Sequence, residues 1–298
     1  RLLGELREAA PFTRALSPNL LTGVPDEFFA VTRHAEIIEI SRRATDFCSG
    51  RGATNIPDMP AEALEYFGSF INMDDPRHAR QRGIVARSFT PRQLQGVLDS
   101  VERICDEVID GFCERGEVDL VEVFSQPFPL LIICDMMGIP RTEFTTVLEA
   151  TNVILGSGDP DTFEGDDIIA ALFAAGERLT SLMRELADHR REHPADDLTT
   201  KLVFNDVDED MLAPEDLGAF FILLAVAGND TTRTALSHGT NLLSLNPDQR
   251  AIWMADPDGV TPTAIEEVVR VASPVTFMRR TVTRNLELSG HSFQKGDR

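Results

Sequence analysis

The feature that most constrains this chain is a long apolar segment that is interrupted near its centre by polar residues. Residues 214–245 have the pattern of one helix, and the stretch from Gly218 to Gly228 is the most apolar in the chain. That stretch is about half as long as a membrane-spanning helix needs to be. Polar residues follow at 229–232, and in a buried helix they cost free energy unless they are paired or face a cavity. The segment therefore predicts a buried central helix whose polar residues, at its middle, are either paired or face a cavity.

The spacing within this segment indicates what the site could hold. Ala227 and Thr231 are four residues apart, so they share one helix face. A small side chain beside a hydroxyl leaves room for a small or flat group, and a threonine that bonds to the preceding turn loosens the helix locally. The alternative is that the helix breaks at Gly228 and Asp230 caps a second helix. The local sequence leaves both open.

The rest of the chain predicts a mainly α fold with a small β portion. Helical spacing of apolar residues indicates the following further helices: 35–43, 76–94, 94–113, 127–138, 142–155, 166–193 and 262–272. A strand is expected at 27–33, and alternation over 281–295 with a turn at Gly290 indicates a β-rich tail. The chain contains no repeat, low-complexity tract or linker, so residues 1–298 are expected to form a single domain.

Charge excludes some partners and suggests others. Against 28 Lys+Arg stand 49 Asp+Glu, and this net charge of −21 argues against nucleic acid or an anionic membrane surface as the partner. The local charge is positive over residues 76–98, because this stretch contains no acidic residue and carries Arg77, Arg80, Arg82, Arg87 and Arg92. Such a stretch could dock an acidic protein or an anionic cofactor, and His78 and Arg82 could clamp a carboxylate from one helix face. A solvated basic face is the alternative.

Glu267 and Arg270 form a second candidate pair. They are three residues apart and therefore meet on one helix face. Their neighbours Ile265, Val268 and Val269 are apolar, which predicts a largely buried helix and a structural ion pair. An ordinary exposed salt bridge, which contributes little to stability, is the alternative.

Metal sites and disulfides find little support. The four cysteines are Cys48, Cys105, Cys113 and Cys134, and none lies in a Cys-x-x-Cys pair. They make neither a disulfide framework nor a zinc site. His189 and His193 have metal-ligand spacing but lie in a charged, exposed-looking stretch. The acidic turn 206–210 lacks the glycine and the closing glutamate of a calcium loop. The sequence shows no signal peptide and no membrane span, so a cytoplasmic location is expected.

An acidic helical chain could also be a terpene cyclase, with a metal motif that begins at Asn229. That motif needs Ser or Thr at position 233 and Glu at position 237, where this chain has Arg233 and Ser237.

Taken together, three motifs resemble those of the cytochrome P450 superfamily over essentially the whole chain. They are Ala-Gly-Asn-Asp-Thr at 227–231, Glu-x-x-Arg at 267–270 and a basic pair after Ser273-Pro, with His-x-x-x-Arg at 78–82 upstream. The resemblance implies a P450-like helical fold with haem b as cofactor. It assigns the residues as follows: Ala227 and Gly228 to the oxygen-binding groove beside the haem, Asp230 and Thr231 to proton delivery, His78, Arg82 and Arg280 to the haem propionates, and Glu267 and Arg270 to a structural pair.

Segments 64–70, 132–140, 151–156 and 273–281 are similar to actinobacterial members that hydroxylate methyl-branched lipids and cholesterol side chains. This similarity implies a haem-thiolate monooxygenase that acts on a branched fatty acid, an isoprenoid lipid or a sterol side chain. Oxygen and electrons from a ferredoxin would be consumed, and the basic stretch suits such a donor. The substrate-binding residues implied are Phe67, Phe70, Leu223, Val275 and Phe277.

One part of the family pattern is not found. The axial haem ligand is a cysteine in a Phe-x-x-Gly-x-x-x-Cys-x-Gly loop after Arg280, and no such loop occurs in these 298 residues. The four cysteines lie in earlier segments and do not transfer to that role. We therefore expect a fragment that is cut at both ends and binds haem only with its missing C-terminal part. A haem-free helical lipid-binding protein is the alternative.

Overall fold

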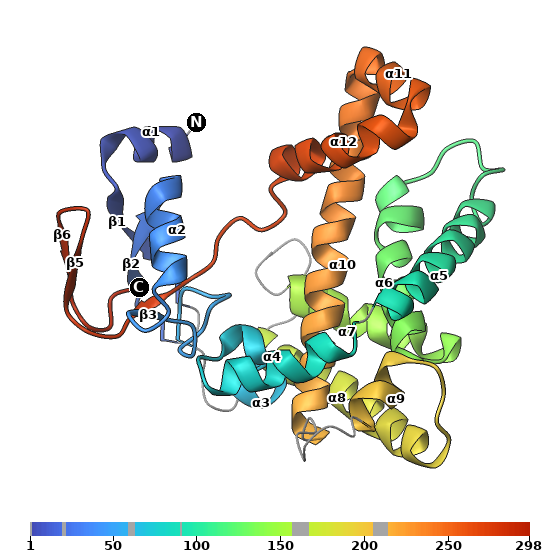
Figure 1. Cartoon of the computed structure of the whole chain (residues 1–298), viewed down its shortest axis with the longest axis horizontal. Helices are drawn as coiled ribbons and strands as arrows, with labels where there is room; N and C mark the ends of the chain where they lie inside the picture. Colours follow the sequence, from blue (N-terminus) through green and yellow to red (C-terminus); the bar gives the residue numbers. More distant parts are fainter. Residues whose placement is uncertain (1, 20–21, 59–62, 90, 157–166, 205–213) are drawn as a thin grey trace. The chain divides into compact units, whose positions relative to one another are not determined.

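The computed structural model describes residues 2–19, 22–58, 63–89, 91–156, 167–204 and 214–298. They fall into two compact units, one made of residues 1–82 with 277–298 and the other of residues 83–276 (Figure 1). The acidic turn expected at 206–210 lies outside the described residues, as does most of the loop after residue 156. Within the described residues the chain is mainly helical with a small β portion, as the sequence predicts, and the strands form three two-stranded sheets.

The smaller unit contains the strands. Its elements are α1 (Leu2–Ala9), β1 (Phe12–Ser17), β2 (Asp26–Val31), α2 (His34–Arg42), β3 (Phe47–Cys48), α3 (Leu64–Phe67), the 3₁₀ turn η1 (Phe70–Asn72), β4 (Thr281–Val282), β5 (Leu286–Leu288) and β6 (His291–Phe293). The strand pairs β1–β2, β3–β4 and β5–β6 are all antiparallel. Because β3 pairs with β4, residues more than 230 positions apart in sequence are joined in one sheet.

Aromatic and aliphatic side chains form the core of this unit. Phe12, Phe47, Val282, Leu288 and Phe293 are buried together. The rings of Phe12 and Phe293 meet edge to face with centroids 4.9 Å apart, a geometry that aromatic pairs favour. The β-rich tail therefore completes the core that β1 and β3 begin.

The larger unit is helical. Its elements are α5 (Pro91–Asp110), the π-helical turn η2 (Val121–Ser125), α6 (Pro127–Met137), the 3₁₀ turn η3 (Arg141–Glu143), α7 (Phe144–Gly156), α8 (Ile168–Glu192), α9 (Leu198–Val203), α10 (Pro214–Leu245), α11 (Pro247–Ala255) and α12 (Pro257–Ala272). Helix α4 (Arg77–Arg87) begins in the smaller unit and ends in this one. Helix α10 is its centre and packs against α6, α7, α8, α11, α12 and η2 (Figure 1).

Several predicted boundaries are wrong. The helices expected to meet at residue 94 are separated by residues 88 and 89, which are not helical, and Pro91 starts α5 because proline suits the first helical position. Helix α12 begins at Pro257 rather than Pro262, since the Asp256 side chain accepts a hydrogen bond from Gly259 N and so caps it. Pro262 lies inside this helix at the cost of one backbone hydrogen bond. The short elements β1, β3, α9 and α11 are not predicted at all.

Candidate functional site

Helix α10 has two unlike faces at its polar centre. Ile222, Ala225 and Asn229 are buried on one side. Leu223, Ala227 and Thr231 follow at spacings of four, so they form a stripe about 160° around the axis from Asn229. On this stripe Ala227 is exposed and the other two side chains are half-buried. The structure thus brings together a predicted substrate-binding residue and two predicted site residues on one accessible face.

The hydroxyl of Thr231 and the carboxylate of Asp230 both have partners in this helix. Thr231 Oγ1 donates to the carbonyl oxygen of Ala227 at 2.7 Å, as the predicted back-bond requires. Asp230 Oδ1 lies 2.5 Å from Nη2 of Arg233, one turn further along. Because α10 is continuous from Pro214 to Leu245, the alternative of a second helix capped by Asp230 is wrong. The Arg233 contact was not predicted, although its i,i+3 spacing was a usable signal.

The three predicted propionate ligands all belong to the smaller unit, with His78 and Arg82 on α4 and Arg280 just before β4. His78 Nδ1 lies 3.3 Å from Asp75 Oδ1. Arg280 donates to the backbone carbonyl of Arg279 at 3.2 Å. Among the described residues, neither Arg82 nor Arg280 has a carboxylate partner. Two arginines without acidic partners, in a chain whose acids outnumber its bases, suit an anionic ligand.

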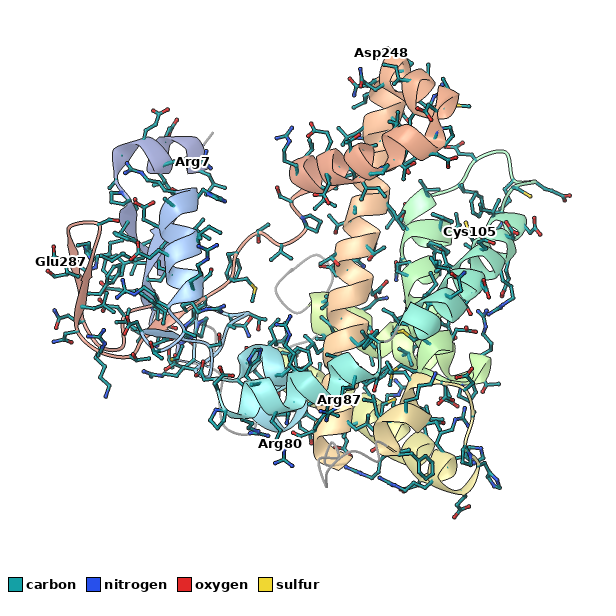
Figure 2. The ribbon with its side chains drawn as sticks, in the orientation of Figure 1. Arg7, Arg80, Arg87, Cys105, Asp248 and Glu287 are labelled. Carbon is teal, nitrogen blue, oxygen red and sulfur yellow. The ribbon has the colours of Figure 1, made fainter. Side chains whose placement is uncertain are left out.

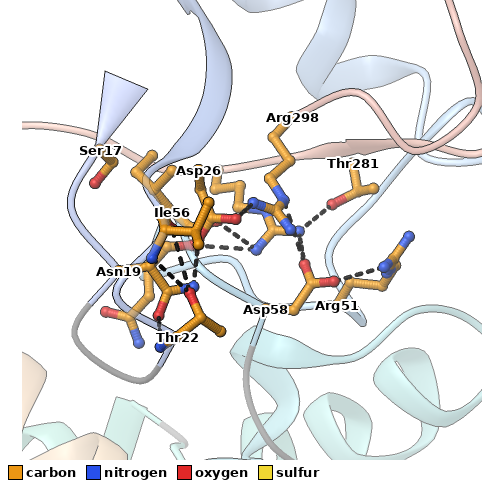
Figure 3. Close-up of polar contacts among 12 residues, drawn as sticks. Ser17, Asn19, Thr22, Asp26, Arg51, Ile56, Asp58, Thr281 and Arg298 are labelled. Carbon is orange, nitrogen blue, oxygen red and sulfur yellow. Dashed lines mark hydrogen bonds and ion pairs between the residues drawn. The ribbon is translucent and has the colours of Figure 1, made fainter. Parts of the chain in front are cut away.

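Arg279, the residue next to Arg280, is turned inward instead. Its guanidinium is buried and donates to the Ile56 carbonyl at 2.8 Å, to Thr281 Oγ1 at 2.8 Å and to the carboxylate of Asp58. Arg51 lies 2.5 Å from the same carboxylate, and Figure 3 labels Asp58 with Arg51 and Thr281. Burial raises the pKa of Asp58, but the bond and charge of Arg279 outweigh it and hold this pKa below its usual value. Sequence reasoning missed this network because an extended basic pair does not reveal which side chain points inward.

No family model matches the chain, but individual relatives do. It is 44% identical over 275 residues to the methyl-branched lipid omega-hydroxylase of Mycobacterium tuberculosis, covering 91% of this chain and 63% of that protein. It is 32% identical to the steroid C26-monooxygenase of Mycolicibacterium smegmatis, covering 99% and 69%. A cytochrome P450 of Mycobacterium marinum, solved with pseudoionone, superimposes with a TM-score of 0.90 at 39% identity, covering 99% of this chain and 72% of that one. The chain belongs to the cytochrome P450 superfamily. It spans about two thirds of the length of these relatives.

The Glu-x-x-Arg pair of this P450 chain is formed but not buried. Arg270 reaches both carboxylate oxygens of Glu267 at 2.7 Å. The side chains of Arg270 and Glu267 are 69% and 62% exposed, and Ile265 and Val269 are exposed as well. The burial expected for this helix is therefore wrong within the described residues. The physical reason is that α12 packs mainly against α10 and α11, which leaves its remaining faces uncovered.

The predicted substrate residues are divided between the units. Leu223 and Val275 belong to the larger unit, and Phe67, Phe70 and Phe277 belong to the smaller one. Phe67 and Phe70 are half-buried, and the Phe70 ring centroid lies 6.3 Å from that of His78. Val275 and Phe277 are 59% and 51% exposed on the segment between α12 and β4. The predicted set therefore draws on residues of both units.

Three of the four cysteines have a thiol whose pKa is raised. Burial raises the pKa of Cys134 to about 12, and burial followed by the charge of Asp74 raises that of Cys48. The pKa of Cys105, labelled on α5 in Figure 2, is also raised by burial and by Asp106. These shifts favour the neutral thiol, whereas iron binds the thiolate. Cys113 is exposed.

Two searches of the described residues found no candidate. No group of three or more His, Cys, Asp or Glu side chains is placed to hold a metal ion. None of the described helices combines the length and the apolar character of a membrane span.

Proposed function

We propose that the protein to which this chain belongs is a haem-thiolate monooxygenase that hydroxylates a hydrophobic substrate. The substrate class is a branched fatty acid, an isoprenoid lipid or a sterol side chain. The observation that carries the proposal is the accessible stripe of Leu223, Ala227 and Thr231 on α10. Relatives over 30% identical that are named methyl-branched lipid omega-hydroxylase and steroid C26-monooxygenase support it.

The residues present fit haem at its two carboxylates. Arg82 and Arg280 are cations without acidic partners among the described residues, and His78 is a third donor for a propionate. When bound with a thiolate ligand, haem supplies the chemistry that activates O2 for insertion into a C–H bond. The cysteine loop of the family does not occur in residues 1–298, and burial favours the thiol form of Cys48, Cys105 and Cys134, so we assign the thiolate to a part of the protein outside these residues.

The side chains of α10 are proposed to handle protons and position the substrate. Leu223 contributes an apolar surface to the substrate, and Ala227 leaves space because its side chain is a single methyl group. The Thr231 hydroxyl, bonded to the Ala227 carbonyl at 2.7 Å, and the Asp230 carboxylate are the proton-transferring groups nearest to that space along the helix. Electrons are proposed to come from a ferredoxin that docks on the basic stretch 77–92. A cytoplasmic location stays a prediction from the sequence.

Thr231→Ala tests the proton-delivery role in the full-length protein. Product formed per electron pair consumed should fall about tenfold or more, since a positioned proton donor contributes roughly 10²–10⁴ in rate. Thr240→Ala is the matched control, because Thr240 makes the same back-bond on the same helix, to Leu236 at 2.9 Å. Equal coupling in the two variants would contradict the role. Lipid binding without haem absorbance in the full-length protein would instead favour the haem-free lipid-binding alternative.

A further inference from the structure

Asn72 is a buried polar residue of the smaller unit whose carboxamide joins two segments. It ends the turn η1 and is 5% exposed. Its Oδ1 accepts from Ala53 N at 2.8 Å, and its Nδ2 donates to the carbonyl oxygen of Phe67 at 3.0 Å. A buried carboxamide that is bonded at both ends keeps one orientation, because an unpaired polar atom in the core costs free energy. Asn72 therefore fixes the backbone at Ala53 relative to the segment that leads into α4.

Ala53 passes this constraint on to the segment that enters β4. It is fully buried in the loop after β3, residues 49–53, and its carbonyl oxygen accepts from Arg279 N at 2.8 Å. Arg279 turns its side chain inward, while Arg280 is half-buried and donates to the carbonyl oxygen of Arg279. Because neighbouring residues share a planar peptide, the bond at Arg279 N limits where the Arg280 side chain can reach.

Asp74 ties the same loop to the start of α4. Its carboxylate accepts from Ser49 N at 2.7 Å and from Gly50 N at 2.9 Å. The carbonyl oxygen of Asp74 accepts from His78 N at 2.9 Å, in the first turn of the helix. The loop after β3 is thus bonded on one side to the turn that carries His78 and on the other side to the backbone next to Arg280.

We propose that Asn72 is a positioning residue for the anion site of the smaller unit. By holding the loop after β3, it sets His78 and Arg280 at the spacing at which both meet the carboxylates of one haem. This inference rests on the proposed function, because it takes haem as the anionic ligand. The Asn72 carboxamide is occupied by Ala53 and Phe67, so Asn72 acts through the backbone, and charge-assisted bonds reward such exact placement.

Haem titration into the haem-free full-length protein tests this role, with haem dimethyl ester as a second probe. The ester carries no carboxylate and so forms no ion pair with Arg280. Asn72→Ala should weaken the binding of haem about tenfold, as expected for one charge-assisted bond, and change the binding of the ester by less than about twofold. A general loss of stability would weaken both ligands equally. Asn72→Ser removes the same carboxamide more mildly and gives the same reading if Asn72→Ala does not fold.

Asn285→Ala is the matched control. Asn285 Oδ1 accepts from Lys295 N at 2.8 Å, which is a bond of the same kind in the same unit but not on the path from Asn72 to Arg280. This control should leave both affinities unchanged. Arg280→Gln is the positive reference and should weaken the binding of haem but not of the ester. Adding Asn72→Ala to Arg280→Gln should then have little further effect, because the two residues serve one contact.

The outcomes separate this proposal from the proposed function. If the wild type prefers haem to the ester but Asn72→Ala weakens both equally or neither, the positioning role is overturned and the proposed function stands. Additive losses for Asn72→Ala and Arg280→Gln would overturn the role as well. A wild type that binds no haem would contradict the proposed function, and the role of Asn72 would fall with it.

Discussion

Gly138 shows how a single missing side chain allows three helices of the larger unit to meet. It ends α6 with a φ of +75°, a conformation that favours glycine. Its carbonyl accepts from Arg190 Nη2 of α8 at 3.1 Å, and Arg190 Nε lies 2.6 Å from Asp197 Oδ2. Asp197 in turn caps α9 by accepting from Thr200 N at 2.8 Å. A Cβ on Gly138 would lie 2.1 Å from Asp197 Oδ2, so the ion pair occupies the space that any side chain would need.

Gly138→Ala should therefore destabilise the protein by about 3 kcal/mol, through left-handed backbone strain together with displacement of a buried ion pair. Gly290→Ala is the control, because Gly290 has a similar φ of +78° but nothing lies within 4 Å of the place that an added methyl group would take. Gly290→Ala should therefore destabilise the protein only by the backbone strain, about 1–2 kcal/mol. Thermal unfolding midpoints of the full-length variants make the comparison, and equal shifts would contradict the role given to the Arg190–Asp197 pair.

At the scale of elements, the Arg279–Asp58 pair ties the loop of residues 51–58 to the segment that enters β4. Arg279 is 2% exposed, so its charge depends on this carboxylate and on the Ile56 carbonyl. Arg298 approaches the same carboxylate at 3.5 Å and also pairs with Asp26 of β2 (Figure 3). One acidic residue therefore holds three segments of the smaller unit together.

Asp58→Asn should lower the free energy of unfolding at pH 7 by about 1–2 kcal/mol, a figure discounted because Asp58 is one third exposed. The pKa of Asp58 is held below its ordinary value, so its stabilisation is present above about pH 4 and is lost as the pH falls through the folded-state pKa. The variant should thus lose less stability than the wild type between about pH 5 and pH 2. Urea unfolding over that range measures this loss of stability. Glu27→Gln, which breaks the exposed pair with Arg14, should leave the free energy of unfolding unchanged both at pH 7 and at lower pH. The same behaviour in Asp58→Asn would refute the network.

At the scale of the whole molecule, the charge distribution is uneven. The net charge is −21, yet α4 carries four arginines and no acid, and Figure 2 shows Arg80 and Arg87 on it. A basic patch in an acidic protein attracts an acidic partner while the rest of the surface repels it, and salt screens this steering. That combination suits the proposed ferredoxin donor.

Arg87→Glu should slow reduction by an acidic ferredoxin about tenfold at low ionic strength, and the difference should shrink in high salt. Arg250→Glu on α11 changes the charge equally outside the basic stretch and should have a much smaller effect. Stopped-flow reduction over a salt series provides the rates. A reduction rate that is as sensitive to Arg250 as to Arg87 would exclude docking at this stretch.

Helix periodicity made the centre of the site predictable from sequence. The Ala227–Thr231 back-bond and the Glu267–Arg270 pair both follow from fixed helical spacing, whichever neighbours surround them. What periodicity could not supply was tertiary context. The exposure of Glu267 depends on which elements cover α12, and the inward turn of Arg279 depends on a carboxylate more than 220 residues away. Strand β3 was missed because it is only two residues long. Strand β1 is as long as β2, and it was missed because its pairing with β2 stabilises it rather than a pattern of its own.

Oxygen-isotope labelling of the product tests the central claim most directly. The full-length protein would be given a ferredoxin reducing system, a methyl-branched fatty acid and ¹⁸O₂, and the product would be analysed by mass spectrometry. A haem monooxygenase should insert one labelled oxygen atom per molecule of lipid, and Thr231→Ala should yield much less of this product for the same electrons consumed. A haem-loaded protein that binds the methyl-branched, isoprenoid and sterol lipids but leaves all of them unlabelled would contradict the account.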